Sequence, residues 1–214
     1  MSKTRLCLIR HGETTWNSER RLQGHTDIPL NSNGKAQALQ MAQALKKSGL
    51  QFDALYASDL QRAADTANAI VELFQQTAIS KKELRERHFG VLQGLTIEDA
   101  PQREPLVWSA HLSRDVHHEL NGGESIAQFA QRVQTALEHI VQAHFGKTVV
   151  VVSHGGVLDM AFRIASEQEL DAKRVASVPN ASFNWLVHNG VAWEVERWAD
   201  TSHLHDAALD NVDL

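Results

Sequence analysis

Two histidine–glycine pairs are the residues of this sequence best suited to chemistry. His11-Gly12 follows the apolar segment Arg5–Arg10, and His154-Gly155 follows the valine-rich segment 148–153. A neutral imidazole is a good nucleophile near pH 7, and its second ring nitrogen can donate to a carbonyl and so fix the tautomer. Each glycine would let backbone approach a ligand closely, and each pair leads toward a helix N-terminus, which favours anions. A lone histidine is more often structural, but two matched pairs favour a reactive site.

Charged side chains complete this constellation. Arg10 directly precedes His11, and Arg62 lies in the first turn of a predicted helix. Arg62 alone would be read as a solvated surface residue, but beside the histidines an anion pocket explains it better, because a guanidinium matches two phosphate oxygens. Glu86 stands between two arginines, which is typical of a surface ion-pair cluster. It is also suited to be a carboxyl that keeps a proton beside a bound dianion.

The elements that must position these residues alternate between strands and helices. Apolar or β-branched runs predict strands, which are followed by segments with helical spacing of apolar residues. The predicted strands are Arg5–Arg10, Phe52–Ser58, 148–153, and a hairpin of 181–188 and 192–198 around Asn189-Gly190. The predicted helices are 30–49, 58–74, 122–146 and 154–165.

Local signals support these helices. Ser58 with Gln61 and Ser125 with Gln128 have the spacing of capping boxes, and Leu39, Ala42 and Leu45 recur at helical spacing in the first helix. The alternation predicts a single α/β domain over residues 1–214, a three-layer α/β/α sandwich. Its sheet is expected to be mostly parallel, with an antiparallel C-terminal hairpin. The carboxyl ends of the parallel strands are where such sheets bind ligands, which would bring His11 and His154 to one edge.

Composition limits the class of protein. The chain has 214 residues, 43% of them hydrophobic, and a formal net charge of -5. A mildly acidic chain argues against nucleic acid as a partner, and a small anionic substrate is compatible with a few clustered cations. No apolar stretch approaches the roughly 18 residues of a membrane span and no signal peptide is recognised, so a cytoplasmic location without membrane association is expected. The single cysteine, Cys7, is expected to be a buried small residue.

Four motifs occur in order along the chain: RHGETTWN from Arg10, SDLQRAADTA from Ser58, LRERHFGVLQG from Leu84 and VVSHGG from Val151. Together they resemble the histidine phosphatase superfamily, specifically its phosphoglycerate-mutase-like branch. The resemblance implies that His11 becomes a phosphohistidine and that Glu86 is the general acid and base. It implies that Arg10, Arg62 and His154 hold the phosphoryl group, with Asn17, Gln23, Gly24 and Gly155 around the phosphate pocket, and that no cofactor or metal takes part.

The resemblance also gives roles to two further segments. Residues 95–121 have weak periodicity and correspond to an insertion that covers the active site and selects the substrate in relatives, which makes Trp108, His111, Arg114 and His117 candidates for substrate contacts. The tail from 199 to 214 has four aspartates and no lysine or arginine, and it is expected to be partly flexible. His117-His118 and His203-x-His205 are considered as metal ligands, but nothing nearby in sequence completes a site of known spacing.

Three functions follow from these observations. The first is a metal-independent phosphomonoester hydrolase acting on a small phosphorylated metabolite. The second is a phosphoglycerate mutase, whose relatives place a tyrosine, a lysine and an adjacent arginine pair after the acid motif. Here Phe89 stands at the tyrosine position, VLQGLTIEDAPQ has no lysine, and Arg103 and Arg114 are not adjacent.

The third is a non-catalytic binding module, which would require loss of His11 or Glu86, and both are present. The substrate stays open among a sugar phosphate, phosphoglycerate, phosphoserine and α-ribazole phosphate. The oligomeric state, including a homodimer, stays open too.

Overall fold

A six-stranded mixed sheet forms the centre of the molecule. The computed structural model describes residues 3–210, and the strand order is β3-β2-β4-β1-β5-β6. The first four of these are parallel, β5 is antiparallel to β1, and β6 is antiparallel to β5. The strands are β1 (Thr4–Arg10), β2 (Ala54–Ser58), β3 (Ala78–Lys81), β4 (Thr148–Ser153), β5 (Phe183–His188) and β6 (Trp193–Asp200).

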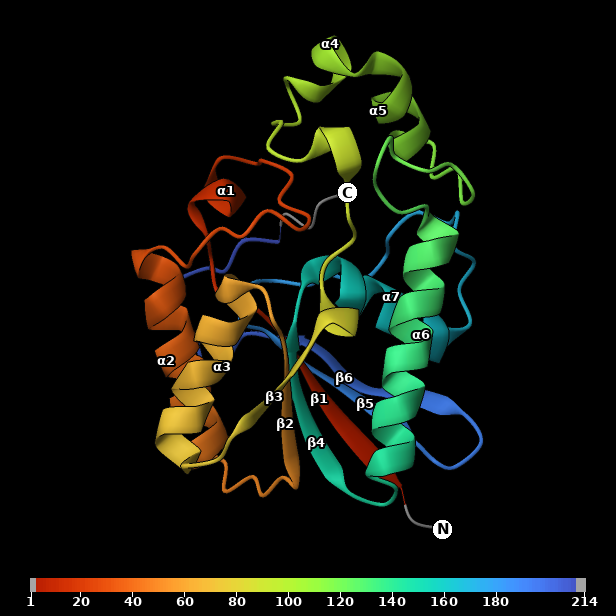
Figure 1. Cartoon of the computed structure of the whole chain (residues 1–214). Coiled ribbons are helices and arrows are strands. Elements are labelled where there is room, and N and C mark those ends of the chain that lie inside the picture. The colour runs from red at the N-terminus through yellow and green to blue at the C-terminus, as the bar shows by residue number, and fades with distance from the viewer. Residues whose placement is uncertain (1–2, 211–214) are drawn as a thin grey trace.

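Four helices cover the two faces of this sheet (Figure 1). The helices α2 (Ser32–Lys47) and α3 (Gln61–Phe74) pack on one face, and α6 (Ile126–Ala143) and α7 (Gly155–Ser166) pack on the other. The central strand β4 sends alternate valines into each layer, which explains its continuous β-branched sequence. The three-layer α/β/α sandwich and the antiparallel C-terminal strands are confirmed.

Short elements gather beyond the carboxyl ends of β1, β2 and β4 (Figure 1). They are α1 (Thr15–Ser18), the 3₁₀ turns η1 (Lys82–Leu84) and η2 (Gly90–Leu92), α4 (Ala100–Arg103) and α5 (Pro105–Leu112). The insertion at 95–121 contains α4 and α5. Its apolar side chains, among them Trp108 and Leu120, form a small cluster with Leu22, Phe89 and Leu92 from earlier segments. This part therefore packs separately from the two layers of the main core.

Three local predictions differ from the structure. Ser58 belongs to β2 and does not cap α3, whose N-cap is Leu60 without a side-chain hydrogen bond. Leu39 is 53% exposed because the buried face of α2 is formed by Ala38, Met41, Ala42 and Leu45. The four-residue edge strand β3 was not predicted, since it is short and largely exposed. The capping box of Ser125 and Gln128 is confirmed at the start of α6.

The described part of the acidic tail lies against the rest of the molecule. Asp210 forms an ion pair with Arg174 at 3.0 Å and accepts a hydrogen bond from the hydroxyl of Ser177 at 2.7 Å. The backbone N–H of Asn180 donates to the carbonyl of Leu209 at 3.0 Å. The flexibility expected for the tail concerns in part residues 211–214, which lie outside the described residues.

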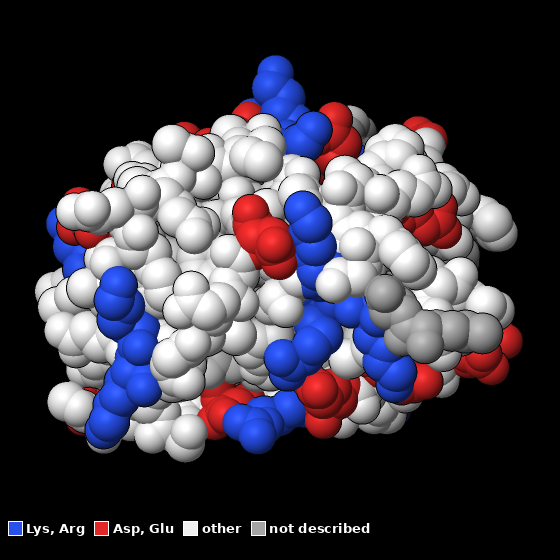
Figure 2. All heavy atoms as spheres, turned by 90° about the horizontal axis from the view of Figure 1, so that it is seen from below, with Lys and Arg blue, Asp and Glu red and all other residues white. Residues whose placement is uncertain are grey.

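The face opposite the short elements carries mixed charge. Figure 2 shows lysine and arginine side chains next to aspartate and glutamate, with uncharged surface between them. Lys3 pairs with Glu194 at 3.4 Å and Arg5 pairs with Glu196 at 2.6 Å, which joins the start of the chain to β6. Within residues 3–210, no helix combines the length and the apolar character needed to cross a membrane.

Candidate active site

His11 is placed where β1 ends and is only 3% exposed. Its Nδ1 lies 2.7 Å from the carbonyl oxygen of Gly12, so Nδ1 carries the hydrogen and Nε2 keeps its lone pair. Burial, and then the charges of Arg62 and Arg10, hold the pKa of His11 well below its usual value. The imidazole is therefore neutral and can act as a nucleophile through Nε2.

Gly12 is required by packing against another backbone segment. A Cβ on Gly12 would lie 2.4 Å from the carbonyl oxygen of Gly34 in the first turn of α2. The N–H of Gly12 also donates to the hydroxyl of Thr66 in α3 at 3.0 Å. Gly12 therefore fixes the loop after His11 to two helices, and the close approach of a ligand to this glycine stays a prediction.

His154 lies at the end of the neighbouring strand β4, as the N-cap of α7, and is fully buried. Its ring centroid is 5.2 Å from that of His11, in an edge-on arrangement at 60°. Burial and the nearby charge of Arg62 lower its pKa far below the usual value, so both rings are neutral. The two matched strand ends thus place a pair of uncharged imidazoles side by side.

Ser58 orients the ring of His154. The hydroxyl of Ser58 lies 2.8 Å from Nε2 of His154 and accepts from the N–H of Leu60 at 3.3 Å. No other acceptor for the hydrogen of the Ser58 hydroxyl is found among the described residues, so we assign Nε2 of His154 as its acceptor, which leaves the ring hydrogen on Nδ1. Nδ1 has no hydrogen-bond partner among the described residues and is available as a donor to an anion. Sequence reasoning missed this role because it assigned Ser58 to a helix cap.

Two buried arginines flank the histidines. Arg10 is 2% exposed and Arg62 is 1% exposed. Backbone carbonyls hold both guanidinium groups: Arg10 donates to Val178 at 2.7 Å, and Arg62 donates to Gly24 at 2.7 Å and to Thr26 at 3.0 Å. Carbonyl partners fix the orientation of a guanidinium without cancelling its charge. The arrangement therefore concentrates positive charge beside two neutral imidazoles.

Glu86 is the only carboxyl among the predicted site residues, and it is 4% exposed. Its Oε1 accepts from the N–H of Arg87 at 2.8 Å, and its Oε2 accepts from the N–H of Gly156 at 2.9 Å. Burial raises the pKa of Glu86, while these two N–H groups and the charges of Arg62 and Arg10 oppose that rise. Two N–H groups thus hold the carboxyl in place, and its pKa lies above that of a free glutamate.

The remaining predicted residues support the loops of this edge. The side-chain oxygen of Asn17 accepts from the N–H of Thr14 at 3.0 Å, and the hydroxyl of Thr14 donates to Gln23 at 3.0 Å. Gly24 has a positive φ of 51° and presents its carbonyl to Arg62. Gly155 is the first residue of α7, directly after His154. Asn180, which the sequence did not indicate, donates to the carbonyl of His11 at 2.9 Å.

The other histidines considered from the sequence lie elsewhere. His117 is exposed, and the Nε2 of His203 lies 3.0 Å from the carbonyl of Ala181. Within the part of the chain that the structure describes, no group of three or more histidine, cysteine, aspartate or glutamate side chains is arranged to hold a metal ion. Cys7 is fully buried in β1, as expected, and burial raises the pKa of its thiol.

The fold and the site define a class of protein: a mainly parallel α/β sheet whose carboxyl edge holds two neutral histidines, two buried arginines and a buried carboxyl. Comparison with known proteins specifies the class further. Residues 6–201 match the histidine phosphatase superfamily (branch 1), and the chain belongs to this family.

Its relatives include both phosphatases and mutase-like proteins. A metal-independent phosphoserine phosphatase of Arabidopsis thaliana is 40% identical over 94% of this chain and 83% of its own length. Phosphoglycerate mutase-like protein 4 of the same plant is 36% identical over 95% of this chain and 88% of its own length. Among solved structures, a mutant phosphoserine phosphatase of Entamoeba histolytica in complex with phosphoserine superposes with a TM-score of 0.83. It is 29% identical in sequence and covers 94% of this chain and 99% of that one.

Proposed function

We propose that this protein is a phosphomonoester hydrolase that works through a phosphohistidine at His11. The observation that carries the proposal is the neutral ring of His11, whose Nδ1 is committed to the carbonyl of Gly12. Nε2 is then the nucleophilic atom, and it lies beside buried arginines. Phosphoryl transfer depends mainly on positioning and on spread positive charge, which Arg10, Arg62 and the Nδ1–H of His154 supply.

The steps follow from these positions. The lone pair of His11 Nε2 forms a bond to phosphorus, and the bond between phosphorus and the ester oxygen breaks. Glu86 gives its proton to that oxygen, so the product leaves as a neutral alcohol. The Glu86 carboxylate then takes a proton from a water molecule, whose oxygen attacks the phosphohistidine and releases inorganic phosphate. Asn17, Gln23, Gly24 and Gly155 keep the loops around the phosphoryl group in place.

Trapping of the intermediate tests this mechanism. Rapid quench with labelled substrate should yield an alkali-stable, acid-labile phosphoprotein, and His11→Ala should abolish both the label and the turnover. His139→Ala is a matched control, because His139 is an exposed residue on the outer surface of α6. Burst labelling that persists in His11→Ala would overturn the assignment of the nucleophile.

The second candidate is a phosphoglycerate mutase, since several relatives carry phosphoglycerate mutase or mutase-like names. A mutase must retain its intermediate until the phosphoryl group returns to the substrate. Arg103 and Arg114 are the arginines of the insertion, and Arg103 is exposed in α4 while Arg114 lines a cavity next to Glu86. Arg103 and Arg114 therefore do not form a paired grip, and any substrate grip of a mutase would depend on the other cations of the cavity, Arg87, Lys173 and Arg174.

The fate of the phosphoryl group separates the two functions. The protein is incubated with 3-phosphoglycerate and a trace of 2,3-bisphosphoglycerate. A phosphatase should release inorganic phosphate faster than it forms 2-phosphoglycerate. Many turnovers to 2-phosphoglycerate for each phosphate released would identify a mutase.

A further inference from the structure

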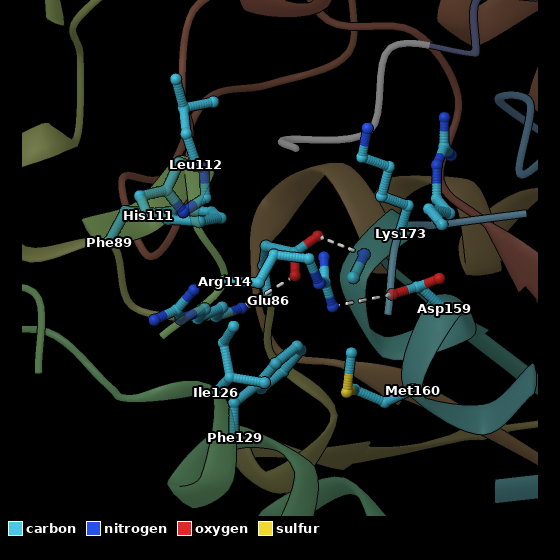
Figure 3. Close-up of a pocket in the computed structure, with 13 residues that line it drawn as sticks. Glu86, Phe89, His111, Leu112, Arg114, Ile126, Phe129, Asp159, Met160 and Lys173 are labelled. Atoms are coloured by element: carbon cyan, nitrogen blue, oxygen red, sulfur yellow. Dashed lines mark hydrogen bonds and ion pairs between the residues drawn. The ribbon is translucent and has the colours of Figure 1, made fainter. Parts of the chain in front are cut away.

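A cavity of about 350 Å³ has Glu86 in its lining, whereas His11 and His154 do not line it. Its lining residues come from the insertion, from α6 and α7, and from the segment around Glu86. Figure 3 shows Glu86 at the centre, with His111 and Phe89 on one side and Asp159 and Lys173 on the other. Its volume is at the lower end of the range for small-molecule sites, about 300–1,000 Å³. The cavity therefore suits a small metabolite.

The position of Glu86 relates this cavity to the proposed reaction. A general acid must contact the oxygen of the leaving group. Glu86 lines the cavity and lies close enough to Arg62 and Arg10 for their charges to lower its pKa, so it is placed between the cavity and the proposed phosphoryl site. The alcohol part of the substrate consequently extends into the cavity while the phosphoryl group stays with His11. The lining of the cavity then selects among substrates.

His111 is the unexplained polar group of this lining. It is 3% exposed in α5, and neither ring nitrogen has a hydrogen-bond partner among the described residues. Its ring packs against Phe89 with centroids 5.6 Å apart and against Trp108 with centroids 5.4 Å apart. A phenylalanine would make these contacts without leaving two buried polar atoms unsatisfied, which is unfavourable. Burial lowers the pKa of His111 to about 3, so the ring offers one donor and one acceptor.

Arg114 brings positive charge to the same cavity. Its guanidinium donates to the carbonyl of Leu170 at 3.1 and 2.9 Å and lies 4.0 Å from the carboxylate of Asp159. That carboxylate already accepts from Arg163 at 2.9 Å, so one negative charge is shared by two arginines.

Three more cations line the cavity, and one of them, Arg174, is paired with Asp210 at 3.0 Å. Arg87 is buried, and burial lowers its pKa to about 10. Lys173 is exposed and forms no ion pair with any residue of the described chain. With Arg114, these side chains give the cavity an excess of positive charge, although much of its wall is apolar and includes Phe129 and Met160.

We propose that His111 and Arg114 determine specificity for a phosphomonoester whose alcohol carries a carboxylate and a hydroxyl or amino group. Arg114 binds the carboxylate, because its guanidinium matches two carboxylate oxygens. His111 exchanges a hydrogen bond with the neighbouring hydroxyl or amino group. This proposal rests on the phosphatase function proposed above and names the substrate class for that site.

Matched substrates test each contact separately. The wild-type protein is assayed for kcat/KM with 3-phosphoglycerate, with glycerol 3-phosphate, which lacks the carboxylate, and with 3-phosphooxypropanoate, which lacks the hydroxyl. A hydrogen bond to a charged group should raise kcat/KM about 10- to 100-fold over a substrate that lacks the group, and a hydrogen bond between neutral groups should raise it about 2- to 10-fold. We define the carboxylate ratio as kcat/KM for 3-phosphoglycerate divided by that for glycerol 3-phosphate, and the hydroxyl ratio as kcat/KM for 3-phosphoglycerate divided by that for 3-phosphooxypropanoate. We expect the carboxylate ratio to be the larger of the two.

Variants assign each preference to a residue. Arg114→Gln should bring the carboxylate ratio close to 1 and leave the hydroxyl ratio, whereas His111→Phe should do the reverse. His111→Leu, which also removes both ring nitrogens, serves if the phenylalanine variant does not fold and should give the same result. Arg103→Gln is the control, since Arg103 belongs to the same insertion but lies outside the cavity lining.

The outcomes separate this proposal from the proposed function. If 4-nitrophenyl phosphate is hydrolysed through His11 but both wild-type ratios are near 1, the substrate class is wrong and the phosphatase function stands. Ratios that the two variants leave unchanged would likewise overturn the roles of His111 and Arg114. If no phosphomonoester is hydrolysed, 4-nitrophenyl phosphate included, both the function and the substrate class fail.

Discussion

Replacement of Glu86 by glutamine should slow the enzyme by an amount that depends on the leaving group. A sugar or glycerol alkoxide needs a proton to depart, whereas 4-nitrophenolate is stable without one. Glutamine has nearly the size of glutamate but carries no transferable proton. The variant therefore tests the role of a proton donor at this position while the volume of the side chain is kept.

The structure also predicts a smaller loss that is common to all substrates. Both oxygens of Glu86 accept from backbone N–H groups, those of Arg87 and Gly156. In glutamine, the NH₂ group would face one of these donors. A buried donor without an acceptor costs about 1–3 kcal/mol. If the whole cost falls on the transition state, kcat/KM decreases about 5- to 150-fold, because each 1.36 kcal/mol corresponds to a factor of ten.

Loss of general-acid catalysis should decrease kcat/KM by a further factor of about 10²–10⁴, but only for alkyl phosphates. The ratio of the two kcat/KM values, alkyl over aryl, should therefore fall by that same factor, because the common loss cancels. In the wild type, this ratio should also fall as pH rises through the pKa of Glu86, which burial places above the usual value, because only the protonated carboxyl donates. Glu86→Gln should remove that pH dependence.

The assay compares glycerol phosphate with 4-nitrophenyl phosphate over a range of pH. Glu83→Gln is the matched control, because Glu83 is an exposed glutamate three residues earlier in the chain. Equal losses for both substrates in Glu86→Gln would refute the acid role and leave Glu86 with a positioning role.

Three further predictions concern the surroundings of the histidines. Ser58→Ala should leave the Nε2 of His154 without its donor at 2.8 Å, and it should decrease kcat while changing KM little. ¹⁵N NMR should show that His154 no longer keeps its hydrogen on Nδ1. An unchanged tautomer would contradict the orienting role of Ser58. Gly12→Ala should reduce the free energy of unfolding by about 1–3 kcal/mol, because its Cβ would lie 2.4 Å from the backbone of Gly34, and thermal unfolding checks this. Turnover should survive exhaustive chelation and be inhibited by orthovanadate, because the two arginines and His154 can stabilise the charge of the transition state; activity restored only by a divalent ion would refute this.

The sequence was sufficient for the parts of this molecule that depend on periodic patterns and on motifs at strand ends. The valine run of β4, the apolar stripe of α6 and the two histidine–glycine pairs each follow from local sequence. Edge strand β3 was missed because a short, exposed strand leaves no periodic signal. Ser58 was misassigned because a serine before a helix has the same local sequence whether it caps the helix or bonds a distant ring. The contact with His154 joins residues 96 positions apart, and spacing alone does not reveal it.

The fold separates the residues proposed to hold the phosphoryl group from those proposed to hold the leaving group. Arg10, His11 and His154 extend from strands of the central sheet, and carbonyl oxygens or neighbouring side chains fix their orientation. His111 and Arg114 belong instead to the insertion, whose apolar cluster packs apart from the main core. Substitutions in that cluster can therefore move the specificity residues while the sheet keeps the nucleophile in place. Because Glu86 lines the cavity and also lies near the arginines of the proposed phosphoryl site, a change of substrate within this fold should act through the insertion and retain the carboxyl.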